Sequence, residues 1–354
     1  MLPRFNAAAV HAAPVFLDRQ ATTEKAVAII REAAKAGAEL IAFPETYIPA
    51  FPVWAALWPP IDNHDLFVRM AEESVLIDGP EVARLCAEAR ALGVTVSIGI
   101  SERSAVSDGC LWNANLLIGE AGDVLVHHRK LVPTFYEKLV WASGDGAGLM
   151  VAETRQGRIG GLICGENTNP LARFALMAQG EQVHISSWPP MWPTRRPAGG
   201  GNFNNVAANR IRASAHCFEA KVFGIVTAGY MDRAMRDFLI ARDGAIADVI
   251  DQTPRAASFF VDPTGEVMGR ALQDDEGIAY AEIDLNASVE PKQFHDVVGY
   301  YNRFDIFDLS IDRTRLTPAK FLDEARAVTA VEPGMRKQAT QSTQAVTAWK
   351  DQLP

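Results

Sequence analysis

Short apolar runs alternate with amphipathic, helix-like segments through most of the chain. Runs that are too short for a helix, and that a Pro, a Gly or a polar turn closes, are predicted to be strands. The predicted strands span residues 39–43, 94–100, 111–118, 124–129, 158–163, 182–187, 222–227, 257–261 and 278–283. Residues 1–17 are compatible with a further strand or with a signal peptide, although Asn6, His11 and Pro14 interrupt their apolar character.

Longer segments carry apolar residues at the spacing of one helix surface. Thr22 or Thr23 can cap the first of these, which Gly37 ends, and Pro80 and Gly93 bracket the second. The predicted helices span residues 22–36, 81–92, 169–179 and 203–218, the last capped by Asn202. Because helices join some predicted strands and hairpins join others, the pattern predicts a layered α/β domain with a mixed sheet system and helices outside.

Composition supports a folded domain with an appendage. The 354 residues are 48% hydrophobic and 22% charged, which is enough apolar material for a large core and excludes disorder and coiled-coil rods. The length lies slightly beyond the roughly 250–300 residues at which single cores stop growing. After residue 311 the chain turns polar, and residues 336–344 carry no apolar stripe. We therefore expect a domain over 1–310 and a tail over 311–354 that is peripheral, disordered, or ordered only by a partner subunit.

Charge and cysteine usage exclude several classes of protein. The net charge of -9 (34 Lys and Arg against 43 Asp and Glu) argues against a nucleic-acid-binding or anionic-membrane surface. No apolar run approaches the roughly 18–20 residues of a membrane span. The four cysteines lie far apart, without the spacing of a metal site. A reduced, cytoplasmic protein without a bound metal is the expectation.

Three reactive side chains follow predicted strands directly. Glu45 follows Leu-Ile-Ala-Phe-Pro, Lys130 follows Val-Leu-Val-His-His-Arg, and Cys164 follows Ile-Gly-Gly-Leu-Ile. The carboxyl ends of strands are where ligands and catalytic groups gather in layered α/β proteins. A carboxylate can take a thiol proton, and a lysine can stabilise negative charge that develops on a substrate. Each residue alone also fits an ordinary role, as a packed cysteine or a surface charge.

Three motifs around these residues resemble a known family. Phe43-Pro-Glu-Thr46, His128-Arg-Lys-Leu-Val-Pro-Thr134 and Cys164-Gly-Glu-Asn-Thr-Asn-Pro170 resemble, in order, the catalytic blocks of the nitrilase branch of the carbon–nitrogen hydrolase superfamily. The resemblance runs from about residue 5 to residue 309. It implies a four-layer αββα sandwich, no metal or organic cofactor, and homo-oligomers from dimers to spirals or filaments.

The resemblance also implies roles for individual residues. Glu45 would be the general base, Lys130 the charge-stabilising lysine and Cys164 the nucleophile. Glu137 would be the second acid of the family, which positions the substrate or the attacking water. The segment Gly299-Tyr-Tyr-Asn-Arg-Phe-Asp305 departs from the more usual Gly-His-Tyr-Ser-Arg-Pro-Asp, so no role for that histidine is carried over.

The nucleophile block bears on the substrate. The run from Cys164 to Pro170 and the segment Ser186-Ser-Trp-Pro-Pro190 look like those of true nitrilases, and Gly165 would leave room and an approachable N–H beside the thiol. The expected reaction is hydrolysis of a small organic nitrile to the carboxylic acid and ammonia. An amidase, an N-carbamoyl amidohydrolase, a cyanide-processing enzyme and an amide-releasing variant remain as alternatives.

Five aromatic residues close to the catalytic blocks are predicted to form the pocket wall: Tyr47, Phe51, Trp54, Tyr136 and Trp188. An aromatic wall suits an arylaliphatic or aliphatic nitrile. The alternative is that several of them are core aromatics, and this applies above all to Trp54.

Three other classes compete with this interpretation. A Cys–His hydrolase would use His127, His128, His184 or His216 as its base. A catalytically silent binding protein on the same fold would not need Glu45, Lys130, Glu137 and Cys164 together. A redox thiol protein would need a resolving cysteine nearby, and both Cys110 and Cys217 are distant in sequence.

Overall fold

The computed structural model describes residues 1–202, 204–322 and 328–330. Met1–Leu316 form one compact unit and Thr317–Pro354 a second, in which β13 (Lys320–Leu322) pairs antiparallel with β14 (Val328–Ala330). Residues 336–344, on which the expected tail rests, lie outside the described residues. A peripheral or partner-ordered tail stays a prediction.

The first unit contains two six-stranded mixed sheets. The first sheet has the order β12-β1-β2-β3-β4-β5, with β1, β2 and β3 parallel and the other pairs antiparallel. Its strands are β1 (Arg4–His11), β2 (Leu40–Ala42), β3 (Thr95–Arg103), β4 (Leu111–Ile118), β5 (Val124–Arg129) and β12 (Gly277–Asp284).

The second sheet has the order β11-β10-β9-β8-β7-β6, with β7, β8 and β9 parallel. Its strands are β6 (Ala152–Thr154), β7 (Gly157–Ile163), β8 (Val183–Trp188), β9 (Phe223–Ala228), β10 (Ser258–Val261) and β11 (Val267–Leu272).

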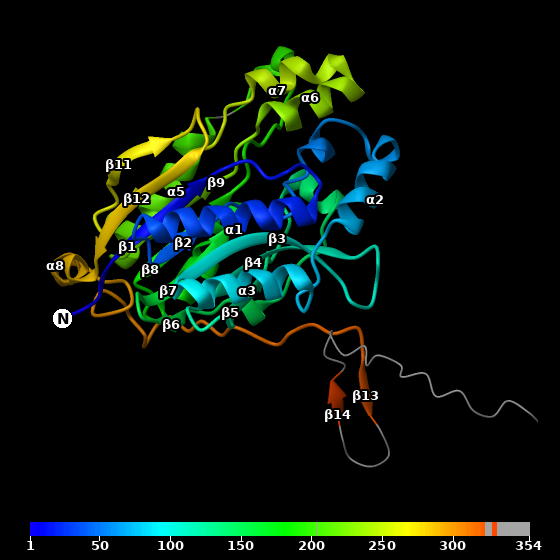
Figure 1. The fold of residues 1–354 in the computed structure, drawn as a ribbon. Coiled ribbons are helices and arrows are strands. Elements are labelled where there is room, and N and C mark those ends of the chain that lie inside the picture. Colours follow the sequence, from blue (N-terminus) through cyan, green and yellow to red (C-terminus); the bar gives the residue numbers. More distant parts are fainter. Residues whose placement is uncertain (203, 323–327, 331–354) are drawn as a thin grey trace, which may run out of the picture. The chain divides into compact units, whose positions relative to one another are not determined.

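Helices cover the outer face of each sheet (Figure 1). α1 (Arg19–Lys35) and α3 (Pro80–Leu92) lie side by side on the first sheet, and α4 (Pro170–Met177) and α5 (Asn205–Ala220) pack on the second. Three further helices, α2 (His64–Glu72), α6 (Arg233–Arg242) and α7 (Ala247–Gln252), share an apolar cluster, and α8 (Val289–Phe294) follows β12. Among the described residues, no helix is both long and apolar enough to cross a bilayer.

Side-chain alternation along the strands builds the layers. On β1, Ala8 and Val10 pack with the helices, whereas Ala7 and Ala9 belong to the apolar layer between the two sheets. On β8, Val183 and Ile185 face the same inter-sheet layer. One face of each sheet packs against the other sheet, and its second face packs against helices. The predicted αββα sandwich is therefore confirmed.

The predicted starts of two helices were wrong, because in each helix a different side chain from the predicted one forms the N-cap. Asp18, not Thr22 or Thr23, caps α1 by accepting a hydrogen bond from the Ala21 N–H. Asn204 caps α5, whereas Asn202 accepts from the backbone of Thr194; residue 203 lies outside the described part. Residues 1–17 contain the strand β1, as one of the two interpretations predicted.

Candidate active site

Glu45 lies on the loop after β2, and this loop packs closely against the neighbouring strand β3. A methyl group at Gly99 of β3 would overlap the backbone of Pro44 and Thr46, so β3 needs a glycine at this point for the loop to lie so close. Glu45 Oε1 accepts hydrogen bonds from Asn113 Nδ2 of β4 at 2.7 Å and from Lys130 Nζ at 2.8 Å. Its Oε2 is buried and has no partner, so this oxygen is available to accept a proton.

Lys130 follows β5, and its side chain is completely buried. Its ammonium bonds Glu45 Oε1 at 2.8 Å and Glu137 Oε2 at 2.6 Å. Burial on its own lowers the pKa of Lys130, but Cys164 and the two carboxylates outweigh it and raise that pKa well above its usual value. Lys130 is therefore a fixed positive charge between two carboxylates.

Glu137 lies in the short 3-10 helix η3 (Phe135–Leu139) and is fully buried. Besides Lys130, its Oε2 accepts from the Thr134 N–H at 3.0 Å, and Oε1 has no partner. The cap of this short helix thus fixes the carboxylate beside the lysine.

Cys164 comes directly after β7 and opens the 3-10 helix η5 (Cys164–Thr168), with a left-handed φ of 50°. Its Sγ and one carboxylate oxygen each of Glu45 and Glu137 lie within 4.8 Å of one another. Burial, followed by the charge of Glu45, raises the pKa of the Cys164 thiol well above its usual value. The resting sulfur therefore keeps its proton until a base removes it.

The pKa of Glu45 suits a proton acceptor. Burial raises it to about 7, with Glu137 adding to the shift and Lys130 opposing it. A carboxylate poised near neutral pH can both take up and return a proton. The geometry thus brings together an acceptor, a fixed cation and a thiol.

A small pocket that is partly open to solvent adjoins the thiol. Of the predicted pocket residues, Gly165 and Trp188 line it together with Cys164. Tyr136 lines a larger hollow, and Tyr47 and Phe51 line a third hollow together with Glu45. Trp54 is only 2% exposed and belongs to an apolar cluster, which favours the core alternative.

The histidines of the competing Cys–His interpretation pair with buried carboxylates instead. His127 bonds Glu102 at 2.7 Å, and His128 bonds Glu166 at 2.9 Å. His184 and His216 both bond Glu181. Beside Cys164 the structure places carboxylates and an ammonium, which favours Glu45 as the base.

The predictions from the sequence did not include several residues of the site. Asn113 holds Glu45, and the pocket lining adds Thr134, Trp192, Asn209 and Arg212. Glu166 accepts from the Ile163 N–H at 2.9 Å and the Leu131 N–H at 2.6 Å, and so ties the Cys164 turn to the Lys130 loop. Glu166 and Thr134 had a local signal, because they lie inside the recognised motifs of Cys164 and Lys130.

Comparison with known proteins agrees with this geometry. The family model described as carbon-nitrogen hydrolase matches residues 6–293. The chain belongs to the carbon–nitrogen hydrolase family. It is therefore a hydrolase that acts on carbon–nitrogen bonds.

Curated relatives of similar length carry nitrilase names. The chain is 35% identical over 327 residues to an aliphatic nitrilase of Rhodococcus rhodochrous, covering 89% of this chain and 84% of the relative. It is 34% identical over 319 residues to a bromoxynil-specific nitrilase of Klebsiella pneumoniae subsp. ozaenae, covering 88% and 86%. An arylacetonitrilase of Hypocrea virens is 33% identical over 311 residues, covering 86% and 91%.

Solved structures share the fold. A carbon–nitrogen hydrolase from Helicobacter pylori G27 superposes with a TM-score of 0.64 at 19% identity, covering 86% of this chain and 97% of that one. The NitFhit protein of C. elegans superposes with a TM-score of 0.66 at 17% identity, covering 91% and 70%.

The buried ion cluster predicts a pH-dependent stability defect in Lys130→Met. Removing the ammonium leaves two unpaired buried carboxylates, so the free energy of unfolding at about pH 8 should fall by about 3 to 5 kcal/mol. Without Lys130, burial and the charge of Glu137 hold the pKa of Glu45 still further above its unfolded value. The folded variant then binds protons that the unfolded chain does not, so the defect should shrink as the pH is lowered to about 6.

Urea unfolding of wild type and variant at several pH values measures this defect. The control is Lys138→Met, an exposed lysine of the same short helix, which should change the free energy of unfolding by less than about 0.5 kcal/mol. A Lys130→Met defect that is absent, or that stays constant with pH, would contradict the charge arrangement.

Proposed function

We propose that the protein is a nitrilase, which hydrolyses a small organic nitrile to the carboxylic acid and ammonia. The observation that carries this proposal is the close approach of the Glu45 carboxylate, the Lys130 ammonium and the Cys164 thiol, of which the thiol lines a pocket. Such a set can activate a sulfur nucleophile and balance charge on an electrophilic carbon–nitrogen group.

The first step forms a covalent bond to sulfur. Glu45 takes the thiol proton, the Cys164 sulfur attacks the nitrile carbon, and one electron pair of the triple bond moves to nitrogen. The Lys130 ammonium and the Gly165 N–H stabilise the charge that develops there, and the proton held by Glu45 passes to the nitrogen. The product is a neutral thioimidate, in which the carbon–sulfur bond has replaced one carbon–nitrogen bond.

Two water molecules complete the reaction. The first adds to the thioimidate carbon, and a carboxylate passes one of its protons to nitrogen, which gives a tetrahedral adduct with a hydroxyl and an amino group. The hydroxyl proton then passes to the amino nitrogen by the same route, the carbon–nitrogen bond breaks, and ammonia leaves a thioester. The second hydrolyses the thioester to the carboxylic acid and restores the Cys164 thiol. Glu137 lies on the other side of Lys130, where its unpaired Oε1 can orient water.

Three observations support a nitrile over an amide. The curated relatives described above are named as nitrilases at 33–35% identity. Gly165 has no side chain beside the thiol, and a Cβ there would press on Thr134 Oγ1. Trp188, from the nitrilase-like segment, lines the pocket at Cys164. Homo-oligomeric assembly and a cytoplasmic location stay predictions.

The proposal predicts which products appear with a panel of nitriles, amides and N-carbamoyl compounds. Wild type should release ammonia and carboxylic acid from at least one nitrile, faster than from the matching amide. Cys164→Ala and Glu45→Gln should each lose most of the activity, by roughly 10³-fold or more, because groups that act as a unit do not contribute additively.

Cys110→Ala is the matched control, since Cys110 is a half-buried thiol on the turn before β4, outside the residues that line the pocket. It should keep wild-type rates. Ammonia from amides alone would favour the amidase alternative. Ammonia from cyanide, or amide as the main product, would favour the corresponding variants. No ammonia from any compound, with the Cys164 thiol shown to be free, would favour a silent binding protein.

A further inference from the structure

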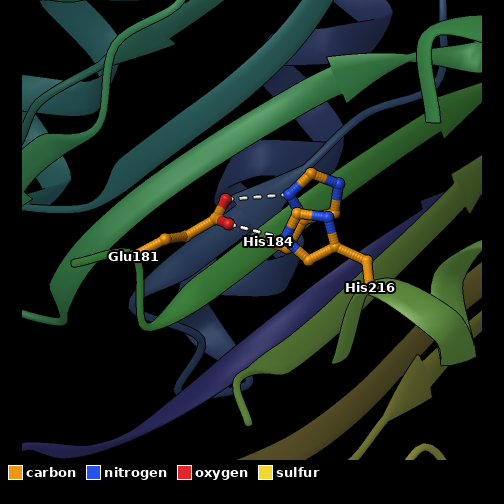
Figure 2. A group of neighbouring side chains, drawn as sticks. All are labelled: Glu181, His184 and His216. Carbon is orange, nitrogen blue, oxygen red and sulfur yellow. Dashed lines mark hydrogen bonds and ion pairs between the residues drawn. The ribbon is translucent and has the colours of Figure 1, made fainter. Parts of the chain in front are cut away.

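A buried cluster of Glu181, His184 and His216 lies outside the residues of the proposed mechanism (Figure 2). Glu181 precedes β8, His184 stands on β8, and His216 comes from α5. All three are at most 3% exposed, and a methyl group at Gly160 of β7 would collide with the Glu181 carboxylate. Buried polar groups need hydrogen-bonding partners, so we consider the partner of each nitrogen and oxygen atom in the cluster.

The cluster is connected to the nucleophile through Asn167. The side-chain amide of Asn167 donates to the Leu162 carbonyl at 3.1 Å and to the Cys164 carbonyl at 3.0 Å. Its Oδ1 accepts from Ser186 Oγ at 2.9 Å and faces His184 Nε2 at 2.9 Å. Asn167 therefore links the backbone on both sides of Ile163 to β8.

These contacts fix the protons of the cluster. Because the NH₂ end of Asn167 must face the two carbonyls, its oxygen faces His184, and His184 Nε2 must donate. His184 Nδ1 lies 2.8 Å from a Glu181 carboxylate oxygen, so the ring bridges Asn167 and Glu181 through its two nitrogens. His216 donates through Nε2 to Glu181 at 2.6 Å, while its Nδ1 has no partner, as expected for a neutral ring.

The titration of the neighbours agrees with this assignment. Burial raises the pKa of Glu181, but the two histidines outweigh burial and bring it to about 2. Burial, followed by the charge of His184, lowers the pKa of His216 to about 4. The two rings stack at 3.6 Å with 18° between their planes. Parallel rings whose nitrogens already face carboxylate oxygens at hydrogen-bond distance leave no room for a metal ion between them.

We propose that the Glu181–His184–Asn167 chain, braced by His216 and Ser186, is a positioning network that holds the Cys164 turn in its left-handed, reactive conformation. A residue other than glycine at a φ of 50° is strained unless its surroundings hold it there. The network supplies that restraint through the Cys164 carbonyl. This inference rests on Cys164 being the nucleophile, as proposed above.

The test combines His184→Gln with two readouts. With nitrile, kcat should fall roughly 10-fold to 100-fold while KM changes little, because a small displacement of the nucleophile slows chemistry more than binding. Without substrate, alkylation of Cys164 by iodoacetamide, followed on the Cys164 peptide by mass spectrometry, should slow. Alkylation needs no turnover, so it reports on the network even if no nitrile is hydrolysed.

Two further variants keep the test decisive. His11→Gln removes another buried histidine with three hydrogen-bonding contacts, so it should lose stability without changing kcat or alkylation. If His184→Gln does not fold, Ser186→Ala removes the other donor to Asn167 Oδ1 and leaves the charged groups intact, with a smaller loss in both readouts. Wild-type kcat and alkylation in a folded variant, or a metal ion bound stoichiometrically at the cluster, would overturn the proposal.

A second observation concerns Arg212 of α5 in the pocket beside Cys164. Two other shielded arginines have acidic partners, since Arg129 pairs with Glu102 and Arg173 with Glu219, whereas the half-buried Arg255 bonds the Met231 carbonyl. Among the described residues, Arg212 has no carboxylate within ion-pair distance, and the pocket lining contains no acidic residue. Its contacts are a hydrogen bond to Asn209 Oδ1 at 3.3 Å and the Trp188 ring, whose centroid lies 5.3 Å away.

The pocket therefore presents an unpaired cation within reach of the nucleophile. Burial raises the pKa of the Cys164 thiol, and Arg212 is among the charges that oppose this shift. Asn209 is 3% exposed and lies on the same helix, and Trp188 and Trp192 line the same pocket. Guanidinium groups in such surroundings bind carboxylates strongly.

We infer that the preferred nitrile carries a carboxylate, which Arg212 binds while the nitrile carbon lies at Cys164. This inference deepens the proposed function and depends on it. The pocket beside Cys164 is small, so a short molecule, the mononitrile of succinic acid, is the probe. Its neutral partner is the compound with a hydroxymethyl group in place of the carboxylate.

Wild type should prefer the anionic probe, and Arg212→Gln should lower its kcat/KM roughly 10-fold to 100-fold, mainly through KM, with little change for the neutral partner. Arg210→Gln, an exposed arginine two positions earlier on the same helix, is the control and should behave as wild type. The probe should also protect Cys164 from iodoacetamide in wild type and not in Arg212→Gln, which tests binding even without turnover. Equal losses for both compounds, no preference in wild type, or no protection would overturn the inference.

Discussion

The site depends on one buried ammonium group shared by two buried carboxylates. Lys130 is completely buried between Glu45 and Glu137, and removing any one of the three leaves unbalanced charge in the interior. The three residues come from loops around β2 and β5 of the first sheet, whereas Cys164 follows β7 of the second. The packing of the two sheets therefore sets the distance between the acid–base pair and the sulfur.

The charge count of this cluster explains how a proton can move within it. With both carboxylates ionised, Lys130 balances only one of them, and the excess negative charge together with burial brings the pKa of Glu45 to about 7. The same surroundings keep the thiol protonated. Proton transfer from Cys164 to Glu45 leaves the number of negative charges unchanged, so the transfer needs little reorganisation of the surrounding dipoles.

The sequence predicted the elements whose signal is local. Strand periodicity and closing glycines were sufficient for a layered α/β domain. The family resemblance that the three motifs carry implied the αββα sandwich and the approach of Glu45, Lys130 and Cys164. The missed features have partners that are far apart in the chain: Asn113 reaches Glu45 from β4, and His216 reaches Glu181 from α5. The predicted start of a helix was wrong where two residues that can form an N-cap lie within a few positions of each other, as Asp18 and Thr22 do. His184 and Ser186 alternate with apolar residues on β8, which indicates that one face of this strand is polar. The pattern does not indicate which residues His184 and Ser186 contact.

The most direct test of the central claim is the mass of the enzyme during turnover. Protein mixed with a slowly hydrolysed nitrile, quenched in acid and digested, should carry an adduct on the peptide that contains Cys164. The added mass should be that of the nitrile for a thioimidate, or that of the acyl group less one hydrogen for a thioester. An adduct on another residue, or steady hydrolysis of the nitrile with Cys164 blocked by alkylation, would contradict covalent catalysis at this sulfur.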